Sequence, residues 1–320
     1  MTTSVRNNVL LYRLSLSVWT ARKLDKSESA KVTQAANAKD GTARVHKDLL
    51  PDCPELEAIR KWSTQLRTFV YLATLPWDDA GWRAGNVAKH MDFMSDVGDR
   101  IREGDALVDQ FIAVYQQAIA QAQFELADMF NAADYDTAEQ VRRKFSFSID
   151  VMPITNTDDF RVVEGLSQGE ADRLVASAQA GVEERVKAAM EDANQRLYDV
   201  VAKMASTLSA FGAGEIKKFN DTLVSNISDL VQVMPALNLT NDPKLAELAT
   251  KAKELALYSA VDLRKDPAVR EAAMTEARAL AELMQPTTIP VSYEQAVGRI
   301  DRPAAKPAAA ALYADMLAGD

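Results

Sequence analysis

Residues 167–211 read SQGEADRLVASAQAGVEERVKAAMEDANQRLYDVVAKMASTLSAF, a stretch without proline in which apolar side chains recur every three or four positions. From Leu174 to Phe211, ten steps cover 37 positions, a mean of about 3.7 residues, close to the period of an α-helix. A helix of this length would extend roughly 65 Å and must lie against a partner helix, in this chain or in another. The stretch therefore predicts an extended helical protein that acts through contacts. The stripe consists of Leu174, Ala178, Val182, Val186, Ala189, Ala193, Leu197, Val200, Met204, Leu208 and Phe211.

Signals at both ends make this stretch the first arm of a helical hairpin. Ser167 and Glu170 have the spacing of a capping box, and Gly212 predicts the end of the helix. The mean step is longer than the 3.5 residues of a left-handed coiled coil, so we expect a nearly straight helix or a slight right-handed supercoil. A return helix over residues 215–233, stopped by Pro235, would cover about half of the first arm. The uncovered part, near residues 174–189, then requires the following helices or another molecule.

Two Asp-Pro pairs mark the starts of further helices. At positions 242–243 and 266–267, an aspartate N-cap precedes a proline at the first helical position. They predict helices over residues 243–260 and 267–284. We therefore expect residues 166–284 to form a domain made of a helical hairpin and a helical bundle.

Residues 285–320 form a tail rich in proline and alanine, which is typical of a linker. Within it, residues 308–317 could form a short amphipathic helix that docks on a partner, folds back on the body of the protein or frays. The apolar side chains of this segment are Leu312, Tyr313, Met316 and Leu317.

The first half of the chain mixes two periods. Alternating apolar residues indicate strands, and a three-to-four-residue spacing indicates helices. The expected strands are residues 9–19, 42–50, 145–153 and a short one at 160–163, and the expected helices are residues 26–38, 54–73 and 86–131. In the first strand one face is expected to carry Leu10, Tyr12, Leu14, Leu16 and Val18.

Residues 86–131 are expected to break or bend near Gly98 and Gly104, because glycine weakens a helix. Asp136 and Glu139 suggest a capping box. We expect residues 1–165 to form one domain, and the fold class is α+β and predominantly α-helical. A small N-terminal sheet packs with helices, followed by the long helical hairpin and bundle.

Composition restricts the class of protein. Of 320 residues, 48% are hydrophobic and 26% are charged, which is ordinary for a soluble globular protein. The single Cys53 excludes an internal disulfide and suits a reducing cytoplasm. The chain has no apolar run of 18 residues and no persuasive signal peptide. A net charge of −9 argues against a general nucleic-acid binder, and we expect neither nucleic acid nor membrane as a partner.

Residues that could carry chemistry are few. The only histidines, His46 and His90, lack the spacing of metal ligands, and no phosphate loop, dinucleotide fingerprint or nucleophile turn occurs. We therefore predict no catalytic residue, no cofactor and no metal ligand. One alternative is a metal-dependent enzyme that uses the acidic helix face of Asp92, Asp96 and Asp99, within residues 92–109. A solvated acidic face explains the same residues.

Several apolar side chains are candidates for protein contacts. Trp77 and Trp82 flank Asp78-Asp79 and Gly81 in a loop, which is either a recognition surface or a loop packed onto the core. Phe211 lies at the tip of the predicted hairpin, so a second alternative is a membrane-active hairpin. A helix turn packed on another subunit is the simpler interpretation. The candidate interaction residues are Trp77, Trp82, Leu174, Val182, Val186, Phe211, Tyr313 and Leu317.

Two segments resemble a known group of proteins. Residues 134–149 read DYDTAEQVRRKFSFSI and are followed by MPI at 152–154 and DDFRV at 158–162. Together with SVWTARKL at 17–24, they resemble an uncharacterised, mainly helical family of bacteriophage and prophage proteins. The resemblance covers roughly residues 9–235 and carries no known catalytic role.

Members of that family are often encoded near a MoxR-type AAA+ ATPase and a von Willebrand factor A protein. The resemblance therefore implies a substrate, adaptor or scaffold of a remodelling machine in the host cytoplasm. Our leading hypothesis is a non-enzymatic, phage-type protein that acts through protein contacts, either by self-assembly into a homo-oligomer or by docking to the ATPase complex.

Overall fold

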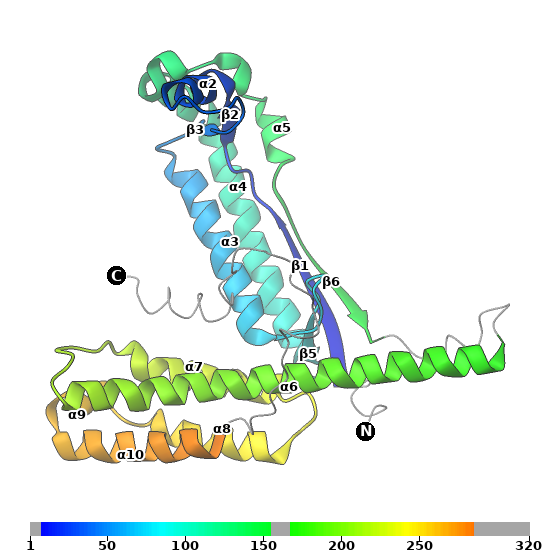
Figure 1. Ribbon diagram of the computed structural model, residues 1–320, viewed down its shortest axis with the longest axis vertical. Helices are drawn as coiled ribbons and strands as arrows, with labels where there is room; N and C mark the ends of the chain where they lie inside the picture. Colours follow the sequence, from blue (N-terminus) through cyan, green and yellow to red (C-terminus); the bar gives the residue numbers. More distant parts are fainter. Residues whose placement is uncertain (1–7, 155–166, 285–320) are drawn as a thin grey trace. The chain divides into compact units, whose positions relative to one another are not determined.

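The computed structural model describes residues 8–154 and 167–284 (Figure 1). The described part is predominantly helical and contains a small antiparallel sheet packed against long helices, which confirms the predicted α+β class. Its contacts divide into two compact units. The bundle unit contains the described residues among 1–12, 71–90 and 151–320, and the aromatic unit contains residues 13–70 and 91–150. The boundary expected at residue 165 lies outside the described residues.

The bundle unit is built around α6 (Gln168–Gly212). Ser167 caps it by accepting a hydrogen bond from the Glu170 backbone N–H at 3.3 Å, and the helix ends at Gly212, as predicted. The helix α10 (Pro267–Met284) packs along it, and α7 (Thr222–Leu237) packs on both α6 and α8 (Pro243–Leu255). The short α9 (Ala260–Lys265) precedes α10. The core between these helices is aliphatic.

The return arm differs from the prediction at both ends. It begins at Thr222 instead of residue 215, because the chain first forms a turn in which Gly214 has a φ of 79° and Phe219 is buried. It also continues through Pro235 to Leu237. A proline removes one backbone hydrogen bond and crowds the carbonyl four residues before it, and in the last turn this local cost does not stop the helix. The helix predicted over residues 243–260 ends at Leu255, whereas α10 matches its prediction.

The larger sheet has the strand order β4-β5-β1-β6. Its strands are β1 (Val9–Ser17), β4 (Leu75–Pro76), β5 (Arg83–Asn86) and β6 (Ser146–Pro153). The strands β1 and β5 pair antiparallel, with Val9 opposite Asn86. The expectation of one buried face on β1 holds at its C-terminal end, where Leu14 and Leu16 are half-buried and Ser15 and Ser17 are exposed, but it is wrong for the first residues, Val9 to Tyr12. Val9 and Leu11 join the aliphatic core, and Tyr12 is buried on the other face, because both faces of this end of β1 are covered.

The aromatic unit begins with a two-stranded antiparallel sheet of β2 (Arg22–Asp25) and β3 (Val45–Asp48), joined through α2 (Lys26–Ala35). Most of α3 (Pro54–Ala73) and of α4 (His90–Leu126) belongs to it. Short helices lie on either side of α4. The 3-10 helix η1 (Val87–Lys89) precedes it, and the 3-10 helices η2 (Ala127–Met129) and η3 (Ala132–Asp134) and the short α5 (Ala138–Arg142) come after it. The short strand expected near residues 160–163 lies outside the described residues.

Two predictions about helix ends in this unit are corrected. The helix α4 is continuous through Gly98 and Gly104. Gly104 is required for another reason, because a Cβ there would lie 2.1 Å from Cζ2 of Trp62. The capping box is formed by Thr137 and Gln140, one residue beyond the predicted pair, because the Thr137 hydroxyl and the Gln140 side chain satisfy each other's backbone N–H groups.

Candidate interaction surface

A groove runs between α7 and α8 of the bundle unit and has a volume of about 630 Å³. Its floor is apolar, because Met234, Leu245 and Ala249 are buried. Gln232 and Lys253 stand exposed at its rim. The lining residues are Ser228, Val231, Gln232, Met234, Pro235, Asn238, Asn241, Leu245, Ala246, Ala249, Thr250, Lys253 and Ala256.

Small side chains create the space. The α8 wall uses positions 246, 249, 253 and 256, which recur every three or four residues along one side of the helix. Three of these four positions are alanine. Helices pack at an axis separation of about 8–10 Å when small side chains line the contact. The groove therefore has the shape of a docking site for another helix.

A polar clamp holds the two walls at a fixed angle. The side chain of Asn238, at the end of α7, donates to the backbone oxygen of Asp242 at 2.9 Å and accepts from its N–H at 2.8 Å. Asp242 in turn caps α8 by accepting from the Lys244 N–H at 2.8 Å. Asn241 supplies the left-handed turn, with a φ of 53°. The groove is thus built into the α7–α8 connection.

The sequence alone did not reveal this groove. Both helices were predicted, but the sequence pattern did not predict that they lie side by side with a space between them. A usable signal existed, because alanines at 246, 249 and 256 share one side of α8. Their significance depends on α7 lying alongside, which the sequence pattern does not state.

The predicted interaction residues of α6 lie in different surroundings. Val182 and Val186 belong to the aliphatic core, which also contains Leu75 of β4, so the chain itself covers part of the face that was expected to require a partner. Leu174 is 40% exposed. Phe211 is partly buried and meets Phe219 edge-to-face, with ring centroids 5.0 Å apart. Tyr313 and Leu317 lie outside the described residues.

The tryptophan loop packs onto the bundle core. Trp77 is buried in the aliphatic cluster, and Trp82 is partly buried against it. The Trp77 backbone N–H donates to the Trp82 oxygen at 3.0 Å, and the guanidinium of Arg185 lies 5.9 Å from the Trp77 ring centroid. Of the two readings of this loop, the geometry matches a loop held down by its tryptophans.

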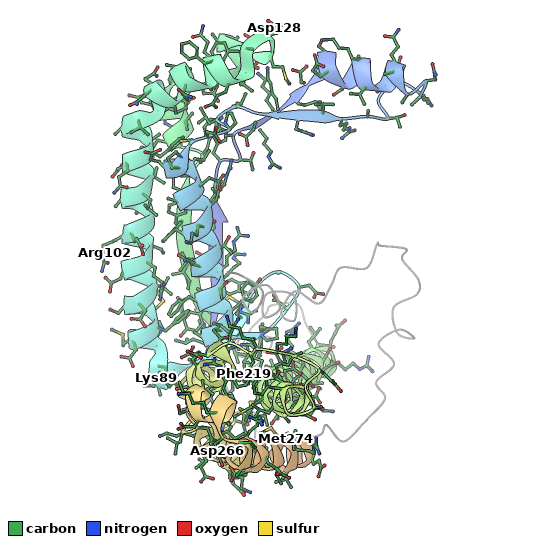
Figure 2. The ribbon with its side chains drawn as sticks, turned by 90° about the vertical axis from the view of Figure 1, so that its left-hand side faces the viewer. Lys89, Arg102, Asp128, Phe219, Asp266 and Met274 are labelled. Carbon is green, nitrogen blue, oxygen red and sulfur yellow. The ribbon has the colours of Figure 1, made fainter. Side chains whose placement is uncertain are left out.

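The acidic face of α4 is solvated. Asp92, Asp96 and Asp99 are exposed, and Asp99 pairs with Arg102. Figure 2 shows Arg102 on α4. Within residues 8–154 and 167–284, no three histidine, cysteine, aspartate or glutamate side chains gather as a possible metal site.

The two histidines and the cysteine lie in different surroundings. His90 Nδ1 lies 3.0 Å from the hydroxyl of Tyr12, while His46 is exposed on β3. Burial raises the pKa of Tyr12 to about 12 and also raises the pKa of the Cys53 thiol. A buried thiol with a raised pKa is a poor nucleophile at neutral pH.

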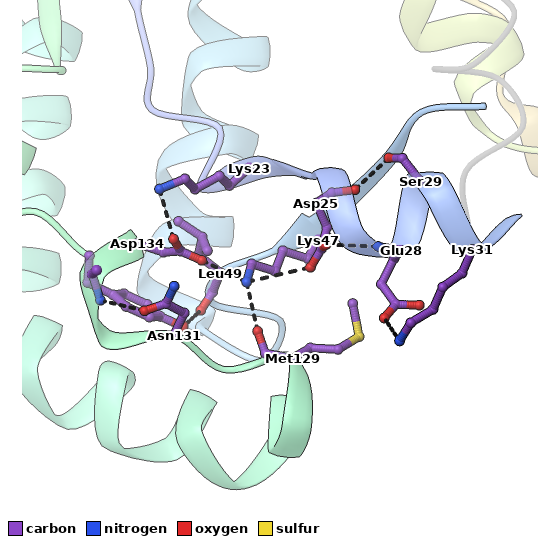
Figure 3. Close-up of polar contacts among 12 residues, drawn as sticks. Lys23, Asp25, Glu28, Ser29, Lys31, Lys47, Leu49, Met129, Asn131 and Asp134 are labelled. Atoms are coloured by element: carbon purple, nitrogen blue, oxygen red, sulfur yellow. Dashed lines mark hydrogen bonds and ion pairs between the residues drawn. The ribbon is translucent and has the colours of Figure 1, made fainter. Parts of the chain in front are cut away.

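A buried ionic network ties the β2–β3 sheet to η2 and η3 in the aromatic unit (Figure 3). Lys47 Nζ lies 2.7 Å from Asp134 Oδ2, 2.7 Å from the Met129 oxygen and 3.8 Å from Asp25 Oδ2. Lys23 reaches Asp134 Oδ1 at 2.8 Å. Burial alone would raise the pKa of Asp134, but the hydrogen bonds from Lys23 and Lys47 outweigh it and lower that pKa. Two of the three donors of Lys47 have acceptors at hydrogen-bond distance, and the Asp25 carboxylate lies nearby, so Lys47 is a structural group here.

Two buried arginines of the bundle unit meet the end of α3. Arg83 donates to Thr74 Oγ1 at 2.7 Å and to the Thr74 oxygen at 2.8 Å, while Arg196 donates to the Tyr71 oxygen at 2.9 Å and pairs with Asp192 at 2.7 Å. Burial and, after it, the charge of Arg196 lower the pKa of Arg83 to about 10. Helix C-termini leave carbonyl oxygens unpaired, so these arginines serve the fold.

Comparison with known proteins adds no relative. No family model matches the chain, and neither the curated proteins nor the solved structures give a significant match. Among the residues that the structure describes, none of the helices combines the length and the apolarity required to cross a bilayer.

Proposed function

We propose that this protein is a non-enzymatic scaffold or adaptor that acts through protein contacts and seats an amphipathic helix of its partner between α7 and α8. The observation that carries the proposal is the α7–α8 groove, with its apolar floor and its volume of about 630 Å³. An amphipathic helix lying in an apolar groove is a recurrent mode of protein recognition.

The dimensions of the groove define the partner segment. Its α7 wall extends from Ser228 to Asn238 and its α8 wall from Leu245 to Ala256, each about 15 Å at the rise of an α-helix. Three helical turns of a partner fill that length. The small side chains of Ala246 and Ala249 allow a partner backbone to approach closely.

Charge defines the partner further. Lys253 is the one charged side chain among the lining residues. An opposite charge at the rim of a docking site improves specificity and the rate of association more than affinity. The preferred partner helix therefore carries apolar residues on one face and an acidic residue beside them.

The resemblance to phage and prophage proteins supports a choice of partners. The segment DYDTAEQVRRKFSFSI at 134–149 carries it, and it implies a neighbouring MoxR-type AAA+ ATPase and a von Willebrand factor A protein. The partner helix would come from that complex or from a second copy of this chain, in the cytoplasm of the host.

A matched pair of variants tests the proposal. Ala246→Glu places a charge in the groove, whereas Ala272→Glu places the same charge at an exposed position of α10 outside it. The full chain and both variants are purified alone for light scattering at micromolar concentration, and with the ATPase and the von Willebrand factor A protein for co-elution.

Wild type and Ala272→Glu are expected to self-associate or to retain the partners, and Ala246→Glu to bind at least about tenfold more weakly, because it buries an unpaired charge. A strictly monomeric wild-type protein that retains neither partner would overturn the proposal. Equal binding by the two variants would overturn the groove as its site.

A further inference from the structure

We infer that residues 308–317 of this chain seat themselves in the α7–α8 groove of the same molecule and that a partner helix must displace them. The inference rests on the proposed function, because it assigns a resident occupant to the same groove. It makes the groove a regulated site in place of a permanently open one.

The pattern of the segment suits the groove. Residues 308–317 read AAAALYADML, and as a helix they would place Leu312, Tyr313, Met316 and Leu317 on one face. Ten residues extend about 15 Å as a helix, which matches the walls of the groove. The alanines on the other positions favour helix formation.

Charge agrees with the same placement. Asp315 is the charged residue within 308–317, and it lies three positions from Leu312, at the edge of the apolar face. The groove presents Lys253 at its rim. The segment therefore combines an apolar face with an adjacent acidic residue, the two features proposed above for the partner helix.

The length of the connecting chain permits binding within one molecule. The helix α10 packs on α8, and its last residue, Met284, is buried in the core. Residues 285–307 then connect it to the segment, and they span at most about 80 Å when extended. The longest helix of the bundle unit, α6, extends about 65 Å, so the groove lies within reach.

A tether makes weak affinity sufficient. A linker of this size gives an effective concentration on the order of 1 mM. A segment with an intrinsic Kd on the order of 0.1 mM would then fill the groove in about 90% of molecules. A partner helix would face an apparent affinity about tenfold weaker than that of an empty groove.

Cysteine cross-linking in the full chain tests the placement directly. In a Cys53→Ala background, Thr250→Cys at the groove is combined with Tyr313→Cys in the segment. The control pairs Tyr313→Cys with Lys251→Cys, an exposed residue of α8 that does not line the groove. Mild oxidation is followed by non-reducing electrophoresis.

The expected result is rapid disulfide formation within single chains for the Thr250 pair, at least about tenfold faster than for the Lys251 pair. Cross-linked dimers without an intramolecular product would assign the segment to a second copy and overturn the inference. Equal rates for the two pairs would also overturn it.

Hydrogen exchange gives an independent measurement that needs no cysteine. The double variant Leu312→Ser/Leu317→Ser is expected to speed exchange in α7 and α8 severalfold and to leave the control, Ile289→Ser/Val291→Ser, like wild type. Unchanged exchange in α7 and α8 would overturn the inference.

The two proposals fail separately. If Ala246→Glu still abolishes partner binding while cross-linking and exchange are negative, only the resident segment is lost. If Ala246→Glu leaves partner binding intact, the groove fails as the functional site, whatever the segment does.

Discussion

The two units of this chain are held together by different chemistry. The core of the bundle unit is a continuous aliphatic cluster from α6, α7, α8 and α10. The aromatic unit depends on ring contacts, such as Trp19 with Phe111 and Trp62 with Phe147, whose centroids lie 6.3 and 4.5 Å apart. It also contains the buried Lys47–Asp134 pair.

The difference shows which kind of core can be predicted from a sequence. An aliphatic helical core repeats every three or four residues, so each helix displays its own buried face. Aromatic and ionic contacts join residues that are distant in sequence, and each works only if the partner arrives in the correct geometry. The following substitutions test whether the two cores respond as this distinction requires.

The largest effect is expected in the aliphatic core. Leu197→Ala removes a side chain that is 1% exposed on α6 and should lower the free energy of unfolding of the bundle unit by about 4 kcal/mol. Leu174→Ala, at an exposed position of the same helix, should cost about 0.5 kcal/mol or less. Urea unfolding with hydrogen exchange in α6 and α10 measures both. Similar losses would show that α6 is packed equally at Leu197 and at Leu174, against this structure.

A comparable effect in the aromatic unit requires only one added carbon. Gly104→Ala places a methyl group against the Trp62 ring and should cost about 3 kcal/mol, because neither the helix nor the buried indole can move away freely. Gly98→Ala is the control on the same helix, since its Cβ would meet Arg102 Nη1 at an ordinary 3.6 Å.

That control should stabilise the unit by up to about 1 kcal/mol, because alanine favours helix over glycine. Combining Gly104→Ala with Trp62→Leu should cost less than the sum of the separate changes, which urea unfolding detects as a coupling energy. Additive costs would rule out the close contact.

These glycines also show where sequence reasoning ends. Both were expected to bend α4, because local propensity treats glycine as a breaker. Whether a glycine breaks a helix or admits a neighbour depends on the partner, and Trp62 is remote from Gly104 in the sequence. The same holds for Arg196, a charged residue beside the apolar stripe of α6 that is buried because the end of α3 accepts its hydrogen bonds.

Local signals were sufficient elsewhere. The bounds of α3, α6 and α10 follow from periodicity and from caps such as Ser167. Both signals depend only on residues a few positions apart in the sequence. The start of α7 was misplaced because the burial of Phe219 depends on α6 and α9, which pack around it through Phe211 and Arg264. The groove was missed for a similar reason, since it is a property of two helices together.

A smaller effect is expected from the ionic network, and it depends on pH. Asp134→Asn leaves Lys47 with the Met129 oxygen and, as its one carboxylate, the weaker Asp25 contact at 3.8 Å, and should cost the aromatic unit about 2 kcal/mol at pH 7. Because the folded-state pKa of Asp134 is lowered below the unfolded value of about 3.9, its contribution is fully present above about pH 5. It is lost as the pH falls through the folded pKa.

Urea unfolding of wild type and Asp134→Asn between pH 7 and pH 3 measures this dependence. The difference between them should shrink as the pH falls, while Leu197→Ala keeps its cost in the bundle unit. A difference that is constant with pH would show that Asp134 contributes by packing and not by its charge.

The smallest effects should be equal in the two units, because helix caps are local in both. Asp242→Ala removes the acceptor for the Lys244 N–H in the bundle unit, and Thr137→Ala removes the acceptor for the Gln140 N–H in the aromatic unit. Each should cost about 1 kcal/mol, and the retained caps Asp242→Asn and Thr137→Ser should cost a few tenths. Hydrogen exchange in α8 and α5 provides the readout. If the caps cost the same while the cores differ in their response to pH and to added volume, the contrast between the units lies in long-range contacts alone. A cap that cost several times more in one unit would mean that local structure there also depends on the surrounding core.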